Sequence, residues 1–187
     1  MRSMRKFILY SREGYTSPFK ESLLKAGRLD TVYQCILTSM FTSHAIRREN
    51  EFHAFLYGRP SPPMHLSIDG STLFDVRVDE DTWRSIILKV LSGETHPGVS
   101  LKKEGIETYA EGLKEIYILS ENGVNIDEVE FGDSPAFFLG DSVGLPKKFE
   151  GLLVRLGGKK VSIGRKRYLA ASTIDIVNYL IDRKESD

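Results

Sequence analysis

Three glycine-bearing segments in the second half of the chain have residue types that suit ligand binding. They are Ser120–Gly123, Gly140–Gly144 and Gly164–Arg167. Glycine lets backbone amides and carbonyls come close to a flat ligand, so such segments can bind an adenine edge without charged side chains. Glycine after a strand also commonly makes a turn. The pattern therefore fits either a cofactor site or a set of ordinary turns.

Other familiar chemistries are absent from the sequence. It contains no G-x-G-x-x-G, no P-loop, no G-x-S-x-G and no H-E-x-x-H. The single cysteine, Cys35, excludes an internal disulfide and a cysteine-based zinc site, and the four histidines show no paired metal spacing. We therefore expect no metal centre.

Each glycine segment follows a short apolar stretch that is typical of a strand. These stretches are Glu115–Leu119, Ala136–Leu139 and Lys160–Ile163. Strands that are buried on both faces and end in loops are typical of a parallel α/β sheet, where ligands bind beyond the carboxyl ends of the strands. The sequence thus predicts an α/β fold, with a mostly parallel sheet flanked by helices and the three glycine segments close together.

The first half of the chain alternates predicted strands and helices. Phe7–Tyr10, Glu51–Tyr57 and Met64–Ile68 are predicted strands, the last two on either side of the proline-rich turn Gly58–Pro63. Apolar spacing predicts helices over Thr31–Ser43 with Asp30 as the N-cap, over Asp81–Leu91 before Ser92 and Gly93, and over Leu169–Arg183.

Length, composition and charge narrow the class of protein. A chain of 187 residues has room for one large domain, and 41% hydrophobic with 28% charged residues is ordinary for a folded, soluble protein. The formal net charge of zero argues against nucleic-acid binding through overall positive charge but leaves local basic patches open. No apolar run approaches the roughly 18 to 20 residues that span a bilayer, and Met1–Lys6 lacks the apolar core of a signal peptide. We expect a cytoplasmic protein.

A resemblance to a known family rests on several segments in order. The stretch Phe137–Pro146, FFLGDSVGLP, followed by Val161–Gly164 and Tyr168–Ala170 before a last helix, resembles the SPOUT methyltransferases. More narrowly, the chain resembles the archaeal tRNA pseudouridine N1-methyltransferases that act on position 54 in the T-loop. The resemblance covers nearly the whole chain, because it extends through Gly27–Asp30, Ser43–Arg48, Gly58–Pro63 and Leu119–Gly123.

The resemblance implies a fold, a cofactor and partners. It implies one domain over residues 1–187, whose part from about 115 to 187 forms a trefoil knot that binds S-adenosylmethionine, with tRNA as substrate and a homodimer as the assembly. Backbone knots are essentially absent from folds in general, so this expectation depends on the resemblance alone. The series Ile174, Val177 and Ile181 in the last helix adds a reason to expect a dimer, since it could bury surface against a second copy.

The resemblance also assigns the cofactor slot residue by residue. Leu119 and the step from Leu139 to Gly140 would line two sides, although plain core packing accounts equally well for Leu119, Leu139 and Ile163. Many relatives have His where this chain has Ser142 and Cys where it has Thr173, so no mechanism here can require those side chains. The remaining slot residues are Ile163, Gly164, Arg165, Lys166, Arg167 and Tyr168 around the adenine, with Leu169 and Thr173 at the last helix.

Methylation of pseudouridine at N1 sets the requirements for the catalytic groups. The base is joined to ribose through carbon, so N1 carries a proton that is lost as the nitrogen attacks the methyl group. An enzyme must align nitrogen, methyl and sulfur, accept or relay a proton, and stabilise charge on the base. Arg28 and Asp30 fit these needs by type, although Asp30 also suits helix capping. The predicted RNA-binding residues are Arg47, Arg48, Lys147 and Lys148, of which Arg47 and Arg48 fit a position near the methyl group or an ordinary surface position equally well.

Two alternatives stay open. A SPOUT enzyme could act on a pseudouridine of ribosomal RNA, which sequence alone separates poorly from tRNA. A relative could also keep the fold as an RNA-binding protein without catalysis. The intact glycine segments speak against this second alternative, because a lost cofactor slot has no need to keep them.

Overall fold

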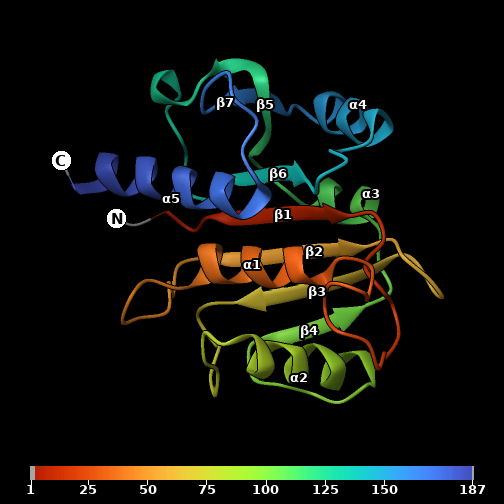
Figure 1. Ribbon diagram of the computed structural model, residues 1–187. Helices are drawn as coiled ribbons and strands as arrows, with labels where there is room; N and C mark the ends of the chain where they lie inside the picture. The colour runs from red at the N-terminus through yellow and green to blue at the C-terminus, as the bar shows by residue number, and fades with distance from the viewer. Residues whose placement is uncertain (1–2, 187) are drawn as a thin grey trace.

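The computed structural model describes residues 3–186, and within them seven strands form one sheet with helices on both faces (Figure 1). The strand order is β4-β3-β2-β1-β6-β5-β7, and only β3 runs antiparallel to its neighbours. The predicted α/β fold with a mostly parallel sheet is therefore confirmed. The strands are β1 Lys6–Ser11, β2 Glu51–Leu56, β3 Met64–Asp69, β4 Val99–Lys102, β5 Ile116–Asn125, β6 Ala136–Gly140 and β7 Lys159–Ser162.

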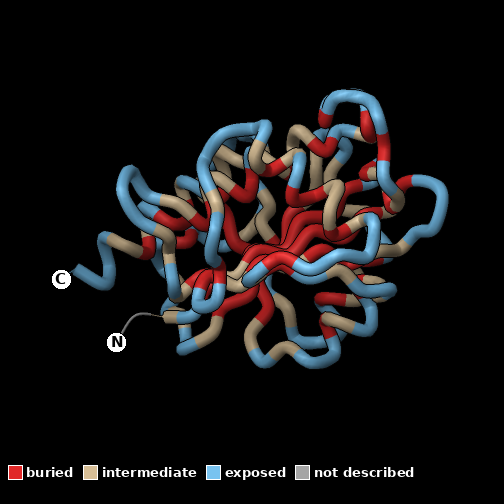
Figure 2. Tube along the Cα trace, turned by 90° about the horizontal axis from the view of Figure 1, so that it is seen from below, coloured by how far each residue is buried: buried red, intermediate tan, exposed pale blue. Residues whose placement is uncertain are grey.

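Alternation along the central strands builds a core on each face of the sheet. In β1, Phe7 and Leu9 pack toward α1, α2 and α5, while Ile8 and Tyr10 pack toward α3 and α4. Buried residues accordingly gather along the sheet in the middle of the molecule (Figure 2). The helices are α1 Leu29–Met40, α2 Glu80–Leu91, α3 Ile106–Glu111, α4 Lys147–Arg155 and α5 Ala170–Ser186, with a short 3-10 helix η1 at Ile126–Glu128.

The apolar series of α5 faces the interior of its own chain. Ile174 and Val177 are 0% exposed and Ile181 is 3% exposed, because α5 packs beside α1 on the sheet. The expectation that this series is buried against a second copy is wrong. Any contact between copies has to use other residues.

Helix α1 begins differently from the prediction. Gly27 and Arg28 both have positive φ, 69° and 61°, and Arg28 occupies the N-cap position without a side-chain cap. Asp30 lies in the first turn, so its predicted role as N-cap is wrong, although a carboxylate there still favours the helix dipole. The helix also ends at Met40, because Phe41 is extended and pairs with Ile46.

Strand β5 is longer than predicted and contains one of the glycine segments. Leu119 and Val124 both register with Val161 of β7, so Ser120–Gly123 is a bulge within the strand and not a loop after it. The added Cβ of any other residue at Gly123 would meet the backbone of Lys160 and Val161 at 2.5 Å. Glycine is required here because two strands approach closely.

A buried arginine attaches α5 to the start of the sheet. Arg5 is 0% exposed, and its guanidinium donates to Asp182 Oδ1 and Glu185 Oε2 at 2.8 Å and to Asn178 Oδ1 at 3.0 Å. Asp182 also accepts two hydrogen bonds from Arg47, at 2.8 and 3.1 Å. This group, the Arg5 cluster, fixes where α5 lies on the sheet.

Candidate functional site

The three glycine segments meet at the carboxyl ends of three neighbouring strands. Strands β6, β5 and β7 are adjacent and parallel, so Gly140, the β5 bulge and Ile163 lie at the same end of the sheet, where these strands have their carboxyl ends. Leu139 is buried in the core cluster against which Leu119 and Ile163 pack. Arg167 Nη2 lies 3.2 Å from Glu121 Oε1 and joins the loop after β7 to the bulge. The predicted convergence is confirmed, while the binding role of these residues stays a prediction.

The loop after β6 closes tightly on itself. A Cβ at Gly140 would overlap the backbone of Gly144 and Leu145, so glycine is needed for this turn. Asp141 fixes the loop, since its carboxylate accepts the amides of Arg12 at 2.9 Å and Val143 at 3.0 Å. The backbone amide of Asp141 also donates to the backbone carbonyl of Tyr10 at 3.1 Å. Asp141 thus joins the loop after β6 to the loop after β1.

The loop after β7 offers the features that an adenine edge requires. Gly164 has φ 138°, and a Cβ there would meet nothing within 4 Å, so the space beside it is open. Within the described part of the chain, the backbone amides of Arg165–Tyr168 donate no hydrogen bonds to protein atoms. At the start of α5, the hydroxyl of Thr173 donates to the carbonyl of Leu169 at 3.1 Å. Amides without protein partners beside an open glycine can donate to a flat ligand, so the predicted adenine contact at this loop stays a prediction.

A cavity of about 500 Å³ opens at the carboxyl ends of β1 and β2, next to the β6 loop. We call it the basic cleft. Its volume lies within the ordinary range of ligand pockets. The residues that matter for its chemistry are Arg12, Tyr15, Lys25, Arg28, Tyr57 and Arg59.

Backbone contacts hold the walls of the basic cleft. A Cβ at Gly27 or at Gly58 would overlap the carbonyl of Glu13, so both ends of the connection from β1 to α1 and the connection after β2 touch through their backbones. Gly58 donates to the Gly14 carbonyl at 2.9 Å. Arg59 lies over the ring of Tyr15, 5.1 Å from its centroid, and donates to the Tyr15 hydroxyl at 2.7 Å. The cleft is therefore preformed, with cations at its mouth.

Arg28 and Asp30 lie together at this cleft. Arg28 Nε donates to Asp30 Oδ1 at 2.9 Å and Nη2 donates to Oδ2 at 3.1 Å, and Arg28 itself lines the cleft. These hydrogen bonds and the charge of Asp30 raise the pKa of Arg28, with a smaller contribution from Asp141. Arg28 is thus a permanent cation between the basic cleft and the β6 loop, and Asp30 fixes its direction.

The other predicted basic residues divide between two ends of the sheet. Lys147 and Lys148 begin α4, just after the β6 loop, and are exposed. Arg47 and Arg48 lie between α1 and β2, at the opposite end of the sheet (Figure 1). Arg47 pairs with Asp182, and Arg48 donates to the carbonyls of Gly70 and Leu73. The structure does not bring Arg47 and Arg48 together with Arg28, and their RNA-binding role stays a prediction.

Several cleft residues escaped the sequence analysis. Arg12, Tyr15 and Lys25 come from the connection between β1 and α1, and Arg59 comes from the connection between β2 and β3. Two signals were usable: Arg12 directly follows the first predicted strand, at the end where ligands of parallel sheets bind, and Arg59 lies in the proline-rich turn Gly58–Pro63. No group of three or more His, Cys, Asp or Glu in residues 3–186 is placed to hold a metal ion.

Comparisons with known proteins match this chain over its length. The family model described as "Putative SAM-dependent RNA methyltransferase" matches residues 4–186. The tRNA (pseudouridine(54)-N(1))-methyltransferase of Methanocella arvoryzae is 34% identical over 193 residues, covering 97% of this chain and 100% of that protein. The protein of the same name from Thermococcus kodakarensis is 34% identical over 198 residues, covering 96% and 99%. The one from Methanocaldococcus jannaschii is 31% identical over 202 residues, covering 97% and 98%.

A solved structure shares the fold. The crystal structure of Archaeoglobus fulgidus Nep1 bound to S-adenosylhomocysteine superposes with a TM-score of 0.69 at 15% identity, and each chain is covered over 100% of its length. At this identity the likeness concerns the fold alone. The match to the family model and the full-length relatives go further: the chain belongs to the family of SAM-dependent RNA methyltransferases that includes the archaeal tRNA (pseudouridine(54)-N(1))-methyltransferases.

Proposed function

We propose that this protein transfers a methyl group from S-adenosylmethionine to N1 of pseudouridine 54 in the T-loop of tRNA, in the cytoplasm. The observation that carries the proposal is the position of Arg28, in a preformed basic cleft directly beside the glycine loops. The names of its full-length relatives supply the choice of nucleotide.

The glycine loops fit the cofactor, and the chain's own residues would bind it there. Leu119, Leu139 and Ile163 offer an apolar surface, and the amides of the loop after β7 offer donors for the adenine. Gly164 leaves the space beside the loop after β7 free of a side chain, and Gly140 allows the tight turn after β6. When bound, S-adenosylmethionine supplies an electrophilic methyl group on a positively charged sulfur, so the proposal includes no metal ion.

The basic cleft would hold the target nucleotide. Arg12, Lys25 and Arg59 provide cations for phosphates, and Tyr15 provides a ring on which a base can stack. Arg28 faces the boundary between the cleft and the β6 loop, where it can stabilise negative charge that develops on the base as N1 loses its proton. Asp30 holds the guanidinium in that direction through two hydrogen bonds.

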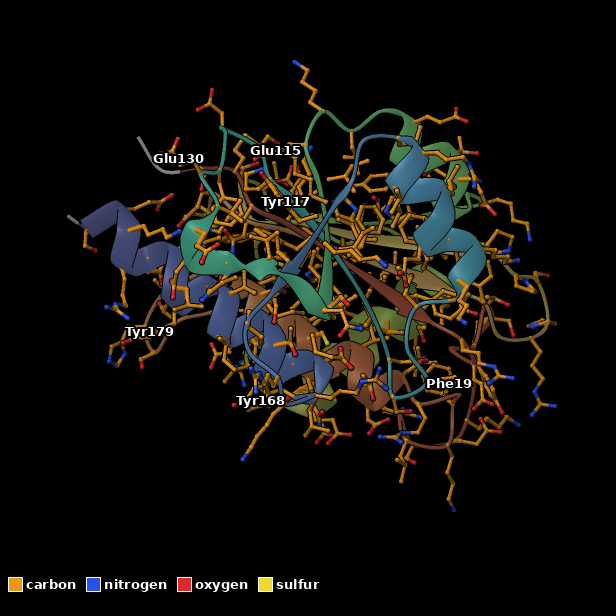
Figure 3. All side chains as sticks on the ribbon, turned by 90° about the horizontal axis from the view of Figure 1, so that it is seen from above. Phe19, Glu115, Tyr117, Glu130, Tyr168 and Tyr179 are labelled. Carbon is orange, nitrogen blue, oxygen red and sulfur yellow. The ribbon has the colours of Figure 1, made fainter. Side chains whose placement is uncertain are left out.

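The knot and the dimer belong to the same proposal. Lys184 of α5 donates to the carbonyls of Ile126 and Val129 at 3.1 Å, so the connection from β5 to β6 lies against α5. The chain reaches α5 from β7, on the far side of β5, which supports passage of residues 163–186 through that connection as in a trefoil knot. Leu169 is 77% exposed and Tyr179 60% exposed. Tyr168 lies just before α5 and Tyr179 lies farther along it (Figure 3), and these exposed side chains support a dimer contact at α5.

The deciding experiment is methylation of defined RNAs by the purified protein. We expect methyl transfer to a T-loop that contains pseudouridine at position 54 and none to the same RNA with uridine there, because only pseudouridine has a protonated N1. Nucleoside mass spectrometry locates the methyl group. Methylation of a ribosomal RNA fragment in place of the T-loop would favour the ribosomal alternative, and cofactor binding without methylation of either RNA would favour the non-catalytic one.

A further inference from the structure

Four titratable side chains form a hydrogen-bonded chain on the α3 side of the sheet, away from the basic cleft. Glu51 and His53 belong to β2, His65 to β3, and Glu104 follows β4. Glu51 Oε2 lies 2.9 Å from His53 Nε2, and His53 Nδ1 lies 2.8 Å from His65 Nε2. His65 Nδ1 lies 2.8 Å from Glu104 Oε2. The chain runs carboxylate, imidazole, imidazole, carboxylate.

The two imidazoles at the centre are enclosed. His53 is 6% exposed and His65 is 3% exposed. Phe55 stacks on His65 with ring centroids 4.3 Å apart, and Tyr109 of α3 covers His53 at 4.8 Å. Glu51 and His53 line a separate cavity of about 370 Å³. Protons can therefore enter through Glu51, while His65 is the more enclosed of the two imidazoles.

Counting hydrogens shows that two neutral imidazoles cannot satisfy this chain. Each of the three contacts is at hydrogen-bond distance and needs one hydrogen, whereas a neutral imidazole carries one and a carboxylate carries none. Two hydrogens for three contacts leave two lone pairs facing each other at about 2.8 Å, which is unfavourable in a buried site. The observed distances thus require a third proton.

We propose that Glu51, His53, His65 and Glu104 form a proton-binding site, which in the native state holds one proton more than two neutral imidazoles do. The bound proton completes the hydrogen bonds that join β2, β3 and the segment after β4. Its release as the pH rises breaks one of them. The proposal is independent of the proposed methyltransferase activity.

The surrounding groups indicate where the third proton resides. Burial lowers the pKa of His65 to about 4, because it outweighs the opposing hydrogen bond to Glu104, and the neighbouring His53 adds to the lowering. His65 is therefore neutral at pH 7. His65 then donates to Glu104 through Nδ1 and accepts through Nε2, which leaves the additional proton on His53. An imidazolium at His53 lies directly against Glu51, whose pKa this hydrogen bond lowers.

Charges from every neighbouring element are consistent with that arrangement. Lys102 of β4 lies 3.1 Å from Glu104, and Lys6 of β1 adds to the lowering of the Glu51 pKa. Tyr109 of α3 contributes no charge, because burial raises the pKa of its hydroxyl. One imidazolium and Lys102 thus balance the two carboxylates.

The extra proton makes stability depend on pH in a characteristic way. In the unfolded chain both imidazoles titrate near pH 6.5, so the two states hold equal numbers of protons there, and above about pH 7.5 the native state holds nearly one proton more. The unfolding constant then rises about tenfold per pH unit until the native chain loses this proton. Below pH 6.5 the sign reverses, because the unfolded chain charges both imidazoles while His65 stays neutral in the native state. Stability is greatest near pH 6.5, whereas two neutral buried imidazoles would give a flat profile above it.

The variant Glu51→Gln separates the hydrogen bonds from the proton. Its amide can donate to His53 Nε2, after which His53 Nδ1–H donates to His65 and His65 Nδ1–H donates to Glu104. All three hydrogen bonds are kept without a third proton. Glu128→Gln, at an exposed position of η1, removes the same charge elsewhere and serves as the control.

The experiment is urea unfolding of the full chain at fixed protein concentration, from pH 6.8 to 8.0. The range stops at pH 8 because burial also raises the pKa of Cys35, whose thiol titrates in the unfolded chain at higher pH. Because both unfolded imidazoles titrate near pH 6.5, we expect unfolding of the wild type and of Glu128→Gln to release about 0.3 proton at pH 6.8 and about 0.9 proton at pH 8.0. Glu51→Gln should instead take up about 0.7 proton at pH 6.8 and almost none at pH 8.0, a difference of about one proton throughout. Nitrogen NMR at pH 7.5 should show a doubly protonated His53 ring in the wild type only. Neutral rings without proton release in the wild type would overturn the proposal, as would full proton release in Glu51→Gln.

Discussion

Arg28 combines permanent charge with a fixed direction. Its positive φ and its two hydrogen bonds to Asp30 hold the guanidinium at the cleft while about half of the side chain stays exposed. Such a preorganised cation is what a developing negative charge on a base requires, because the chain does not have to reorganise during the reaction.

The first prediction follows from that geometry. Arg28→Ala should lower the single-turnover methylation rate by about 100-fold or more, the usual effect of losing a preorganised charge-stabilising group. Its effect on tRNA affinity should be far smaller, because one exposed phosphate contact contributes little by comparison. Arg77→Ala, at an exposed position of the same charge, is the control. If Arg28→Ala weakens rate and affinity by equal factors, Arg28 belongs to the phosphate-binding surface.

Gly164 allows a second prediction with a matched control. Gly164 and Gly157 both have positive φ, 138° and 93°, and a Cβ on either meets nothing within 4 Å. Alanine at each position should therefore cost a similar backbone strain of about 1 kcal/mol. Only Gly164→Ala should weaken S-adenosylmethionine binding in calorimetry, because Gly157 lies between α4 and β7, at the opposite end of that strand. Equal affinities in the two variants would move the cofactor away from the loop after β7.

At the scale of elements, the placement of α5 depends on the Arg5 cluster. Arg5→Met removes a buried cation whose partners are Asp182, Glu185 and Asn178, and should lower the free energy of unfolding by about 3 kcal/mol. Arg183→Met, on the exposed side of the same helix, should change it by less than about 0.5 kcal/mol. Urea unfolding measures both. Comparable losses in the two variants would mean that the cluster contributes little.

The same cluster predicts a response to acid. Burial raises the pKa of Asp182, but hydrogen bonds from Arg47 and Arg5 outweigh it and lower the pKa below its ordinary value. The pKa of Glu185 is lowered in the same sense. A carboxylate with a lowered native pKa stabilises the fold at neutral pH and loses this contribution as the pH falls below about 4. Arg5→Met should therefore lose less stability than the wild type between pH 5 and pH 3, as followed by circular dichroism.

Elements with a strong periodic pattern were predictable, and elements defined by distant contacts were not. The strand Met64–Ile68 and the helix ending before Ser92 emerged nearly as predicted. β4 and α3 are short and gain their order from neighbours, since Val99 pairs with Ile68 across the sheet. α4 was also missed. The bulge at Ser120–Gly123 looked like a loop because its pairing with β7 is not encoded nearby.

One part of the candidate site could likewise be predicted from the sequence and another part could not. Glycine after each apolar stretch predicted that the three segments lie close together, and the resemblance named the residues expected to bind the cofactor there. The basic cleft could not be predicted, because it forms only where Gly27, fourteen residues along the same connection, and Gly58, from the connection after β2, meet the carbonyl of Glu13. Local sequence carries no signal for such a meeting, nor for the different ends of the sheet at which Arg28 and Arg47 lie.

At the scale of the whole molecule, the net charge is zero, so tRNA has to bind to a local basic surface on one side of the protein. Further cations lie at the same end of the sheet as the basic cleft, where the parallel strands have their carboxyl ends. They are Lys147, Lys148 and the loop Arg165–Arg167. Four to six phosphate contacts should make log affinity fall with log salt at a slope of about 3 to 5. Lys147→Ala should lower this slope by about one, whereas Lys89→Ala on α2 should leave it unchanged. A slope near zero in fluorescence titrations would refute a phosphate-binding edge.

The exposed residues of α5 predict the assembly. We expect sedimentation at micromolar concentration to give twice the 21.1 kDa of one chain. Leu169→Glu should shift the protein toward the monomer, because this side chain is 77% exposed in the single chain. Val78→Glu, another exposed apolar position, should not. A wild-type monomer under these conditions would contradict the dimer.

The sheet ends in β4 and β7, which are four residues long, and the free edges of such strands are where chains join into continuous sheets. β7 begins with Lys159 and Lys160, and β4 ends with Lys102. Short edges with lysines resist edge-to-edge pairing, since each added strand would bring like charges together. We therefore expect the edges of the sheet not to pair between copies, so that ordered association would use the exposed residues at α5.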